Sequence, residues 1–335
     1  MTTLIDEGID VSRLSGARDM PLVLGAHDAP PALADWVDAR RASLETALLK
    51  HGALLFRGFP LDCPADFESF AEAISPGLYG EYGDLPKQEG GRNTYRSTPY
   101  PERKMILFHN ESSHLTRWPR RQFFFCELPA DSGGATPIVD CRRMLTALPP
   151  AIVESFERKG LMYVRTFVRG LDVPWRDFFG TDDRAQVERR CEAQRVGYEW
   201  LPGDGLQTRT VSPAVIRHPL SGERSFFNQL QLHHAACLDP DVRRDLAALV
   251  GESRMPRQVY FGDGSPIDDA IVRQVGDAYE ACAVRFDWRR GDVLMLDNML
   301  VAHARDPYRG PRKIVVAMGE MTDRDALVRA PPPAA

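Results

Sequence analysis

The sequence has little that would fit a membrane protein, a secreted protein or a nucleic-acid-binding protein. No apolar run approaches the roughly 18 residues that a transmembrane helix requires. The first ten residues, MTTLIDEGID, lack the basic and apolar regions of a signal peptide. Acidic residues outnumber basic ones by 47 to 42, which gives a formal net charge of −5. Nucleic-acid binding requires a basic surface, so the sequence predicts a protein that binds neither membranes nor nucleic acids.

Cysteine is also scarce and irregularly spaced. The six cysteines form no C-x-x-C pair, so the pattern indicates neither a zinc-binding module nor a disulfide framework. In a chain without a signal peptide, such cysteines are typical of reduced thiols in a cytoplasmic protein. We therefore expect a cytoplasmic location.

The common nucleotide-binding and hydrolase motifs are missing as well. The chain contains no G-x-x-x-x-G-K-[ST], G-x-G-x-x-G, G-x-S-x-G or H-E-x-x-H segment. These absences argue against an ATPase, a Rossmann-type dehydrogenase, a serine hydrolase and a zinc protease.

The order of the predicted elements favours one β-rich domain over 1–335, although a chain of 335 residues could also form two domains. Residues 1–30 have no regular pattern, and a helix is predicted from there to about Lys50. Short apolar strands are predicted toward both ends of the remaining chain, with helical patterns between them. We expect a β-sandwich or jelly roll, mainly β with helical insertions (α+β), with its core at about 30–320. The charged segment 149–205 is predicted to be a helical insertion that acts as a lid.

Two histidines and one glutamate form the pattern that indicates a reaction. His109 and Glu111 follow an apolar run, and residues i and i+2 of an extended chain point to the same side. His303 lies in another short apolar run near the opposite end of the chain. Two imidazoles and a carboxylate on one face of a metal leave its other positions open, as in non-haem Fe(II) oxygenases. An H-x-E triplet alone is weak evidence, because an exposed strand pair would look the same.

Five segments, taken in order, resemble the TauD/TfdA family of Fe(II)/2-oxoglutarate dioxygenases. The likeness covers about 30–320 and is greatest to the syringomycin-type hydroxylases of nonribosomal peptide pathways. The segments are HGALLFRGF (51–59), FHNESSH (108–114), LPADSGGATPIVD (128–140), RHPLSGERSFFNQ (217–229) and LDNMLVAHARDPYRGPRKIVVAM (296–318).

The resemblance implies a double-stranded β-helix, which is a jelly roll, and the use of Fe(II), 2-oxoglutarate and O₂. It implies that His109, Glu111 and His303 are the iron ligands. Related halogenases have a small residue in place of the carboxylate ligand, so Glu111 favours hydroxylation over halogenation.

The resemblance also implies a binding site for the far carboxylate of 2-oxoglutarate. Arg312 matches the arginine that pairs with this carboxylate, and a planar guanidinium can do so through two parallel hydrogen bonds. Lys313 is the alternative if the register is shifted by one residue. Thr136 matches a hydroxyl that helps to hold the same carboxylate.

The substrate is less well defined by the sequence. Asn110, Asn228, Gln229 and Arg305 are candidate substrate contacts, although each also fits a structural role as a cap or an ion-pair partner. The segment 84–91, which is expected near the substrate, departs from the family pattern.

We expect the chain to hydroxylate an unactivated C–H bond of an amino acid, free or tethered to a carrier protein, in secondary metabolism such as antibiotic biosynthesis. Three other outcomes of the same machinery stay open, namely desaturation, epoxidation and oxidative release of a heteroatom, as with taurine. A non-catalytic jelly-roll binding protein is the alternative from another class, and it predicts the loss of a ligand or of the arginine. A homo-oligomer is compatible with the sequence.

Overall fold

A computed structural model describes most of the chain. The described residues are 8–14, 19–27, 33–80, 87–88, 91–97, 100–168 and 170–329. Within them, a seven-stranded sheet and a three-stranded sheet face each other across a cavity, and a further four-stranded sheet belongs to an insertion. This arrangement confirms the jelly roll that the sequence predicts.

The large sheet combines strands from both ends of the chain. Its strands run antiparallel except for the parallel pair β2 and β3. In spatial order they are β1 (Ile9–Arg13), β2 (Leu22–Ala26), β3 (Ala53–Arg57), β15 (Val293–Asp297), β6 (Arg117–Leu128), β18 (Lys313–Asp323) and β4 (Thr94–Arg96).

The first two strands correct the expectation that residues 1–30 are irregular. Leu22, Val23 and Leu24 are buried because β2 pairs with β3 and so extends the large sheet. A short apolar run without clear alternation is hard to recognise as a strand when its partner is distant in sequence.

The small sheet forms the opposite wall of the cavity. Its strands, in spatial order, are β5 (Ile106–His109), β16 (Val301–Arg305) and β8 (Ile138–Asp140). A two-stranded ribbon of β7 (Ser132–Gly133) and β17 (Tyr308–Arg309) continues beside it.

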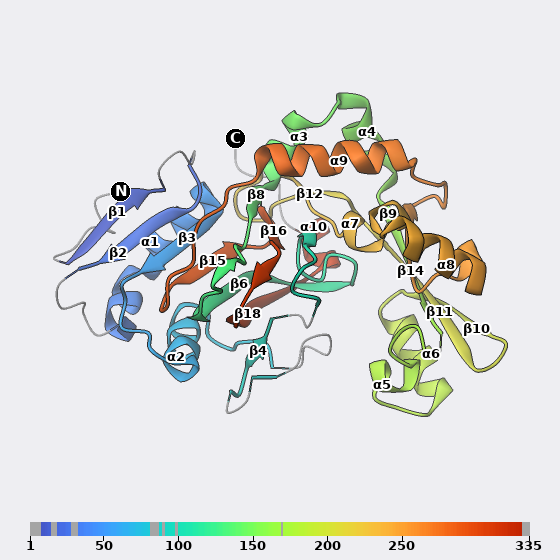
Figure 1. The fold of residues 1–335 in the computed structure, drawn as a ribbon, viewed down its shortest axis with the longest axis horizontal. Helices are drawn as coiled ribbons and strands as arrows, with labels where there is room; N and C mark the ends of the chain where they lie inside the picture. Colours follow the sequence, from blue (N-terminus) through green and yellow to red (C-terminus); the bar gives the residue numbers. More distant parts are fainter. Residues whose placement is uncertain are drawn as a thin grey trace.

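Helices cover the outer faces of both sheets. The helices α1 (Leu33–His51) and α2 (Pro64–Ile74) pack on the large sheet, in a core that includes Trp36, Phe67 and Phe125. Gly52 ends α1 with φ +71°, as its place after the helix predicts. The helices α3 (Cys141–Ala147), α4 (Pro150–Lys159) and α9 (Asp269–Cys282) lie together at the top of Figure 1, next to β8.

The insertion is only partly helical, which corrects the prediction for 149–205. It holds α4, α5 (Trp175–Phe179) and α6 (Arg184–Ala193), but also the strands β9 (Leu161–Phe167) and β10 (Gly197–Leu201). Apolar and β-branched residues make β9 the centre of the sheet β10–β11–β9–β14, whose other strands are β11 (Gly205–Ser212) and β14 (Arg257–Phe261). This sheet lies at the right of Figure 1, away from the large sheet.

The remaining elements are short or lie at the periphery. They are β12 (Val215–Arg217), β13 (Arg224–Phe226), α7 (Leu230–His233), α8 (Pro240–Val250), α10 (Arg324–Arg329) and the 3₁₀ turns Ala235–Cys237 and Glu252–Arg254. Among the described residues, no helix combines the length and the apolar character that a membrane span needs.

Candidate active site

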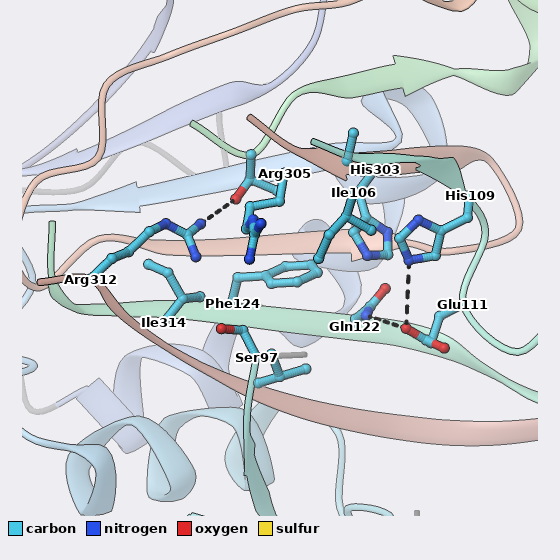
Figure 2. Close-up of a pocket in the computed structure, with 13 residues that line it drawn as sticks. Ser97, Ile106, His109, Glu111, Gln122, Phe124, His303, Arg305, Arg312 and Ile314 are labelled. Carbon is cyan, nitrogen blue, oxygen red and sulfur yellow. Dashed lines mark hydrogen bonds and ion pairs between the residues drawn. The ribbon is translucent and has the colours of Figure 1, made fainter. Parts of the chain in front are cut away.

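The structure brings His109, Glu111 and His303 together on one side of the cavity between the sheets (Figure 2). His109 ends β5 and lies opposite His303 of β16, while Glu111 lies in the turn that follows β5. One potential ligand atom from each residue lies within 4.8 Å of the other two, and all three side chains are buried.

Hydrogen bonding and burial prepare both imidazoles to bind a metal. Nδ1 of His109 lies 2.8 Å from the carbonyl oxygen of Leu107, so an N–H at Nδ1 leaves the lone pair of Nε2 free. Nε2 in turn lies 4.0 Å from Oε2 of Glu111. Burial, followed by the proximity of His109, holds the pKa of His303 well below its usual value. His303 is therefore neutral, which is the form that binds a metal.

Gln122 is a residue of this site that the sequence analysis missed. It is buried on β6, and its Nε2 donates to Oε2 of Glu111 over 3.4 Å. The other oxygen of Glu111 accepts a hydrogen bond of 3.0 Å from the backbone N–H of Ser112. A signal was present, because Gln122 is the only polar residue within the apolar run 122–126.

The donor set fits Fe(II). Two neutral imidazoles and a carboxylate combine intermediate and hard ligands, and no thiolate takes part. Nδ1 of His303 is buried without a hydrogen-bond partner in the described part of the chain, so the ring is not committed to a structural bond through that atom.

Two arginines lie at the end of the cavity opposite the triad. In Figure 2, Phe124 lies between the two ends of the cavity, and Ile314 lies beside Arg312. Arg305 and Arg312 both line it. No carboxylate of the described residues pairs with either guanidinium, so this end of the cavity favours an anion.

Arg312 is held by contacts that leave room for such an anion. Its Nε donates to the carbonyl oxygen of Gly134 over 3.0 Å, and its Nη2 lies 3.4 Å from Oγ1 of Thr136. Oγ1 of Thr136 also accepts a hydrogen bond of 3.1 Å from Nε1 of Trp288. Burial, with a contribution from Arg305, lowers the pKa of Arg312 to about 10. The alternative residue Lys313 faces outward, 3.6 Å from Oε1 of Glu127.

The side chain of Arg305 connects β16 to the neighbouring loop at 100–104. Its guanidinium donates to the backbone oxygens of Tyr100, Pro101 and Lys104 over 3.1, 2.7 and 2.7 Å. Its Nε is buried without a hydrogen-bond partner among the described residues. Arg305 therefore has a structural role and also brings a positive charge to the cavity.

The other three candidate substrate residues lie outside the lining of this cavity. Oδ1 of Asn110 accepts a hydrogen bond of 3.0 Å from the N–H of Asn228, and Nε2 of Gln229 donates to the oxygen of Asn110 over 3.1 Å. These bonds brace the turn that carries Glu111. Substrate contact by Asn110, Asn228 and Gln229 stays a prediction, and most of the segment 84–91 lies outside the described residues.

A jelly roll that presents two histidines and one carboxylate to an open cavity defines the class of non-haem Fe(II) oxygenases. Comparison with known families agrees, since the model for "Taurine catabolism dioxygenase TauD, TfdA family" matches residues 17–318. The chain belongs to this family and is an Fe(II)/2-oxoglutarate-dependent dioxygenase that uses O₂.

A relative of known role supports the same family, and solved structures share its fold. The chain is 33% identical over 305 residues to the dapdiamide synthesis protein DdaC of Enterobacter agglomerans, covering 89% of this chain and 93% of the relative. It is 29% identical over 300 residues to a clavaminate synthase-like protein of Arabidopsis thaliana, covering 86% and 87%. The crystal structure of a taurine dioxygenase from Burkholderia xenovorans shares the fold with a TM-score of 0.54 and 15% identity, over 95% of this chain and 92% of that one.

Proposed function

We propose that this dioxygenase hydroxylates an unactivated C–H bond of an amino acid, free or tethered to a carrier protein, in a biosynthetic pathway such as that of an antibiotic. The observation that carries the proposal is the placement of His109, Glu111 and His303 at one end of a cavity whose other end holds Arg312. In this proposal the triad binds Fe(II).

Arg312 and Thr136 bind the far carboxylate of 2-oxoglutarate in this proposal. The guanidinium has no carboxylate partner among the described residues, and Thr136 adds a hydroxyl beside it. A buried, charge-assisted hydrogen bond is strong because the surroundings screen it poorly. When bound, the metal would activate O₂, which is the oxidant; 2-oxoglutarate would supply two electrons and become succinate and CO₂, and the C–H bond of the substrate would supply the other two.

The amino acid substrate is supported by two observations. DdaC, to which the chain is 33% identical, is named for dapdiamide synthesis, which favours a biosynthetic role over a catabolic one. The cavity is also lined by Gln122 and Arg305, whose Oε1 and Nε atoms respectively are buried without a hydrogen-bond partner among the described residues, and an apolar substrate would leave both atoms unpaired. A plain hydrocarbon or a fatty acyl chain therefore fits it poorly. A cytoplasmic location stays an expectation from the sequence.

The other outcomes of the same machinery, desaturation, epoxidation and oxidative release, are decided by where the substrate lies and not by the triad. The non-catalytic alternative required the loss of a metal ligand or of the arginine. All four residues are present and line one cavity.

The test is a screen for succinate release on amino acids and on carrier-bound aminoacyl groups, with products identified by mass spectrometry. A mass increase of one oxygen, coupled to succinate, is the expected result for one of these substrates. Efficient coupled oxidation of an apolar compound, with none on any amino acid or aminoacyl carrier, would contradict the substrate class but not the cofactors.

A variant pair tests the metal site in the same screen. Glu111→Ala removes a proposed ligand and should abolish hydroxylation, whereas Glu127→Ala removes a carboxylate that pairs with Lys313 outside the cavity and should not. Wild-type turnover by purified, iron-loaded Glu111→Ala would show that the triad assignment is wrong.

A further inference from the structure

Asn298 clamps the peptide of the proposed metal ligand Glu111. It is fully buried in the turn between β15 and β16. Its Oδ1 accepts a hydrogen bond of 2.6 Å from the N–H of Glu111, and its Nδ2 donates to the carbonyl oxygen of Glu111 over 3.0 Å. Nδ2 also donates to the carbonyl oxygen of Pro119 over 2.8 Å. One amide side chain thus holds both backbone polar groups of Glu111.

The backbone N–H and carbonyl oxygen of Asn298 also form hydrogen bonds. Its N–H donates to the carbonyl oxygen of Arg120 over 2.7 Å, and its own carbonyl oxygen accepts a hydrogen bond of 2.8 Å from Nδ2 of Asn110. β16, which carries His303, begins three residues after Asn298. Asn298 therefore connects the segment that contains Glu111 to the segment that contains His303. A movement of either segment would disturb the hydrogen bonds of Asn298.

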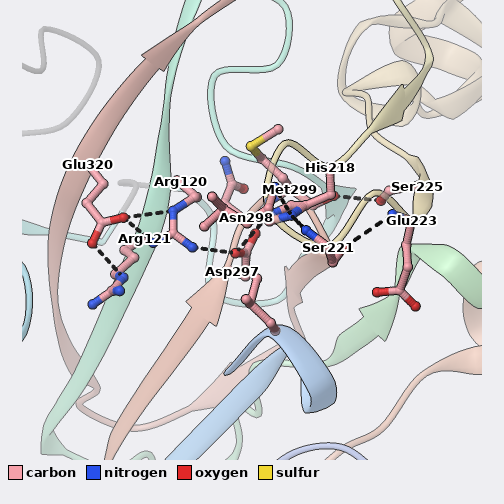
Figure 3. Close-up of polar contacts among 12 residues, drawn as sticks. Arg120, Arg121, His218, Ser221, Glu223, Ser225, Asp297, Asn298, Met299 and Glu320 are labelled. Carbon is pink, nitrogen blue, oxygen red and sulfur yellow. Dashed lines mark hydrogen bonds and ion pairs between the residues drawn. The ribbon is translucent and has the colours of Figure 1, made fainter. Parts of the chain in front are cut away.

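A buried charged network fixes the turn that carries Asn298 (Figure 3). Oδ1 of Asp297 accepts a hydrogen bond of 3.0 Å from the N–H of Met299. Its Oδ2 lies 3.1 Å from Nε2 of His218 and 3.2 Å from Nη1 of Arg120. Burial acts to raise the pKa of Asp297, but the bond from His218 and the charge of Arg120 outweigh it and lower the pKa. The carboxylate is therefore charged and keeps these partners.

The turn that carries Glu111 depends on such support. Ser112, the next residue, has φ +58°, a left-handed conformation that is uncommon for a residue with a side chain. The same Ser112 donates its N–H to Oε1 of Glu111. The orientation of the carboxylate therefore depends on a backbone geometry that surrounding hydrogen bonds must maintain.

We infer that Asn298 is a positioning residue that sets the affinity of the site for its metal by fixing the peptide of Glu111. The inference rests on the proposed function, because it takes Glu111 as a metal ligand. Removing a group that orients a metal ligand through hydrogen bonds typically weakens metal affinity by about 10- to 100-fold. A residue with only a folding role would leave the affinity of the folded protein unchanged.

The experiment is a calorimetric titration of the metal-free protein with Co(II), a redox-stable substitute for Fe(II), below the melting temperature of each variant. Asn298→Ala removes all three side-chain bonds and should raise the Kd for Co(II) by about 10- to 100-fold. Asn298→Asp keeps an acceptor for the N–H of Glu111 and loses the amide donors, so it should raise the Kd by a smaller factor. It also provides a measurement if the alanine variant does not fold.

Gln207→Ala is the matched control, because Gln207 is also a buried amide that bridges two segments. Its Nε2 donates to Oγ1 of Thr166 over 3.0 Å and to the oxygen of Ser253 over 3.3 Å, in the four-stranded sheet. This variant should lower the melting temperature and leave the Kd for Co(II) unchanged. Wild-type affinity in the Asn298 variants, or an equal loss in Gln207→Ala, would overturn the inference.

Glu111→Ala separates this inference from the proposed function. If Glu111→Ala weakens Co(II) binding and the Asn298 variants do not, only the role of Asn298 is wrong. If Glu111→Ala binds Co(II) as the wild type does, the proposed metal site itself is wrong.

Discussion

His303 lies directly opposite His109 on the neighbouring antiparallel strand, and the centroids of the two imidazole rings are 4.2 Å apart. The backbone hydrogen bonds of β5 and β16 therefore set the separation of two proposed metal ligands that come from distant parts of the chain.

The two candidate residues for 2-oxoglutarate binding should behave very differently when replaced. Arg312→Ala should raise the KM for 2-oxoglutarate by about 30-fold or more, because a buried carboxylate loses its charged partner at a cost of about 2–5 kcal/mol. Lys313→Ala, which removes only an outward-facing amine near Glu127, should change the KM little. Succinate release at varied 2-oxoglutarate measures both effects. The opposite ranking would place the anion at Lys313.

A prediction on pH follows from the burial of Arg312, whose pKa is lowered to about 10. The guanidinium is charged below this value, so the KM for 2-oxoglutarate should stay nearly constant from pH 7 to pH 9, about one to three units below it. The KM should rise as the pH passes through about 10, where the charge is lost. The Arg312→Ala variant is the control, since its KM should lack this rise. A rise of equal size in that variant would assign the effect to another group.

The network around Asp297 should stabilise the fold in a pH-dependent way. Asp297→Asn removes one of the three carboxylates that contact the buried Arg120, which keeps Glu45 and Glu320, and should lower the free energy of unfolding by about 1–3 kcal/mol at pH 7. Because the folded-state pKa of Asp297 is lowered, its contribution is present above the unfolded pKa and is lost as the pH falls through the folded one. Urea unfolding should therefore show the full difference at pH 7 and pH 5 and a smaller one near pH 3. A difference that grows toward low pH would contradict the assignment.

Gln122 should tune the metal site from the large sheet. Gln122→Leu keeps the approximate volume and removes the hydrogen bond of 3.4 Å to Oε2 of Glu111. We expect the Kd for Co(II) to rise by about tenfold, at the low end of the range for groups that orient metal ligands. Calorimetry measures the Kd, with Gln207→Leu as the control. An unchanged Kd would limit Gln122 to packing.

The insertion at 149–205 should respond to ligands if it acts as a lid. Together with Leu206 of β11, its residues Phe167, Trp175, Val187 and Cys191 form a small core. Amide hydrogen exchange in this segment should slow when Co(II), 2-oxoglutarate and a substrate are added, whereas exchange in the buried part of α9 should not change. Exchange that is already slow without ligands, and is unaffected by them, would show that the insertion is a fixed structure.

Local patterns in the sequence predicted much of the fold, whereas the choice of the three proposed metal ligands rested on the resemblance to the TauD/TfdA family. An apolar run before His109 and another around His303 are typical of buried strands, and both strands are present. Glu111 lies in the turn after β5, so the i, i+2 spacing of an extended chain does not account for its position. The choice of Arg312 over Lys313 also agrees with the way the two side chains face.

The contacts that local patterns could not predict are those made by tertiary pairing. β2 is stabilised by β3, and β9 by β11 and β14, so a run of apolar residues alone did not define them. Asn298 looks like an ordinary turn residue until the chain folds and brings the peptide of Glu111 within hydrogen-bond distance of its amide. Such a role depends on a partner almost two hundred residues away.

The two guanidinium groups at one end of the cavity affect how the metal and 2-oxoglutarate bind. Arg305 and Arg312 carry two positive charges against the single negative charge of Glu111, and a divalent metal adds two more. In the proposed complex, 2-oxoglutarate, a dianion, offsets part of this excess, so we expect the metal and the dianion each to make the other's binding more favourable. This coupling is reciprocal by thermodynamic necessity. The concentration of 2-oxoglutarate around the enzyme therefore also governs how firmly the enzyme retains its metal.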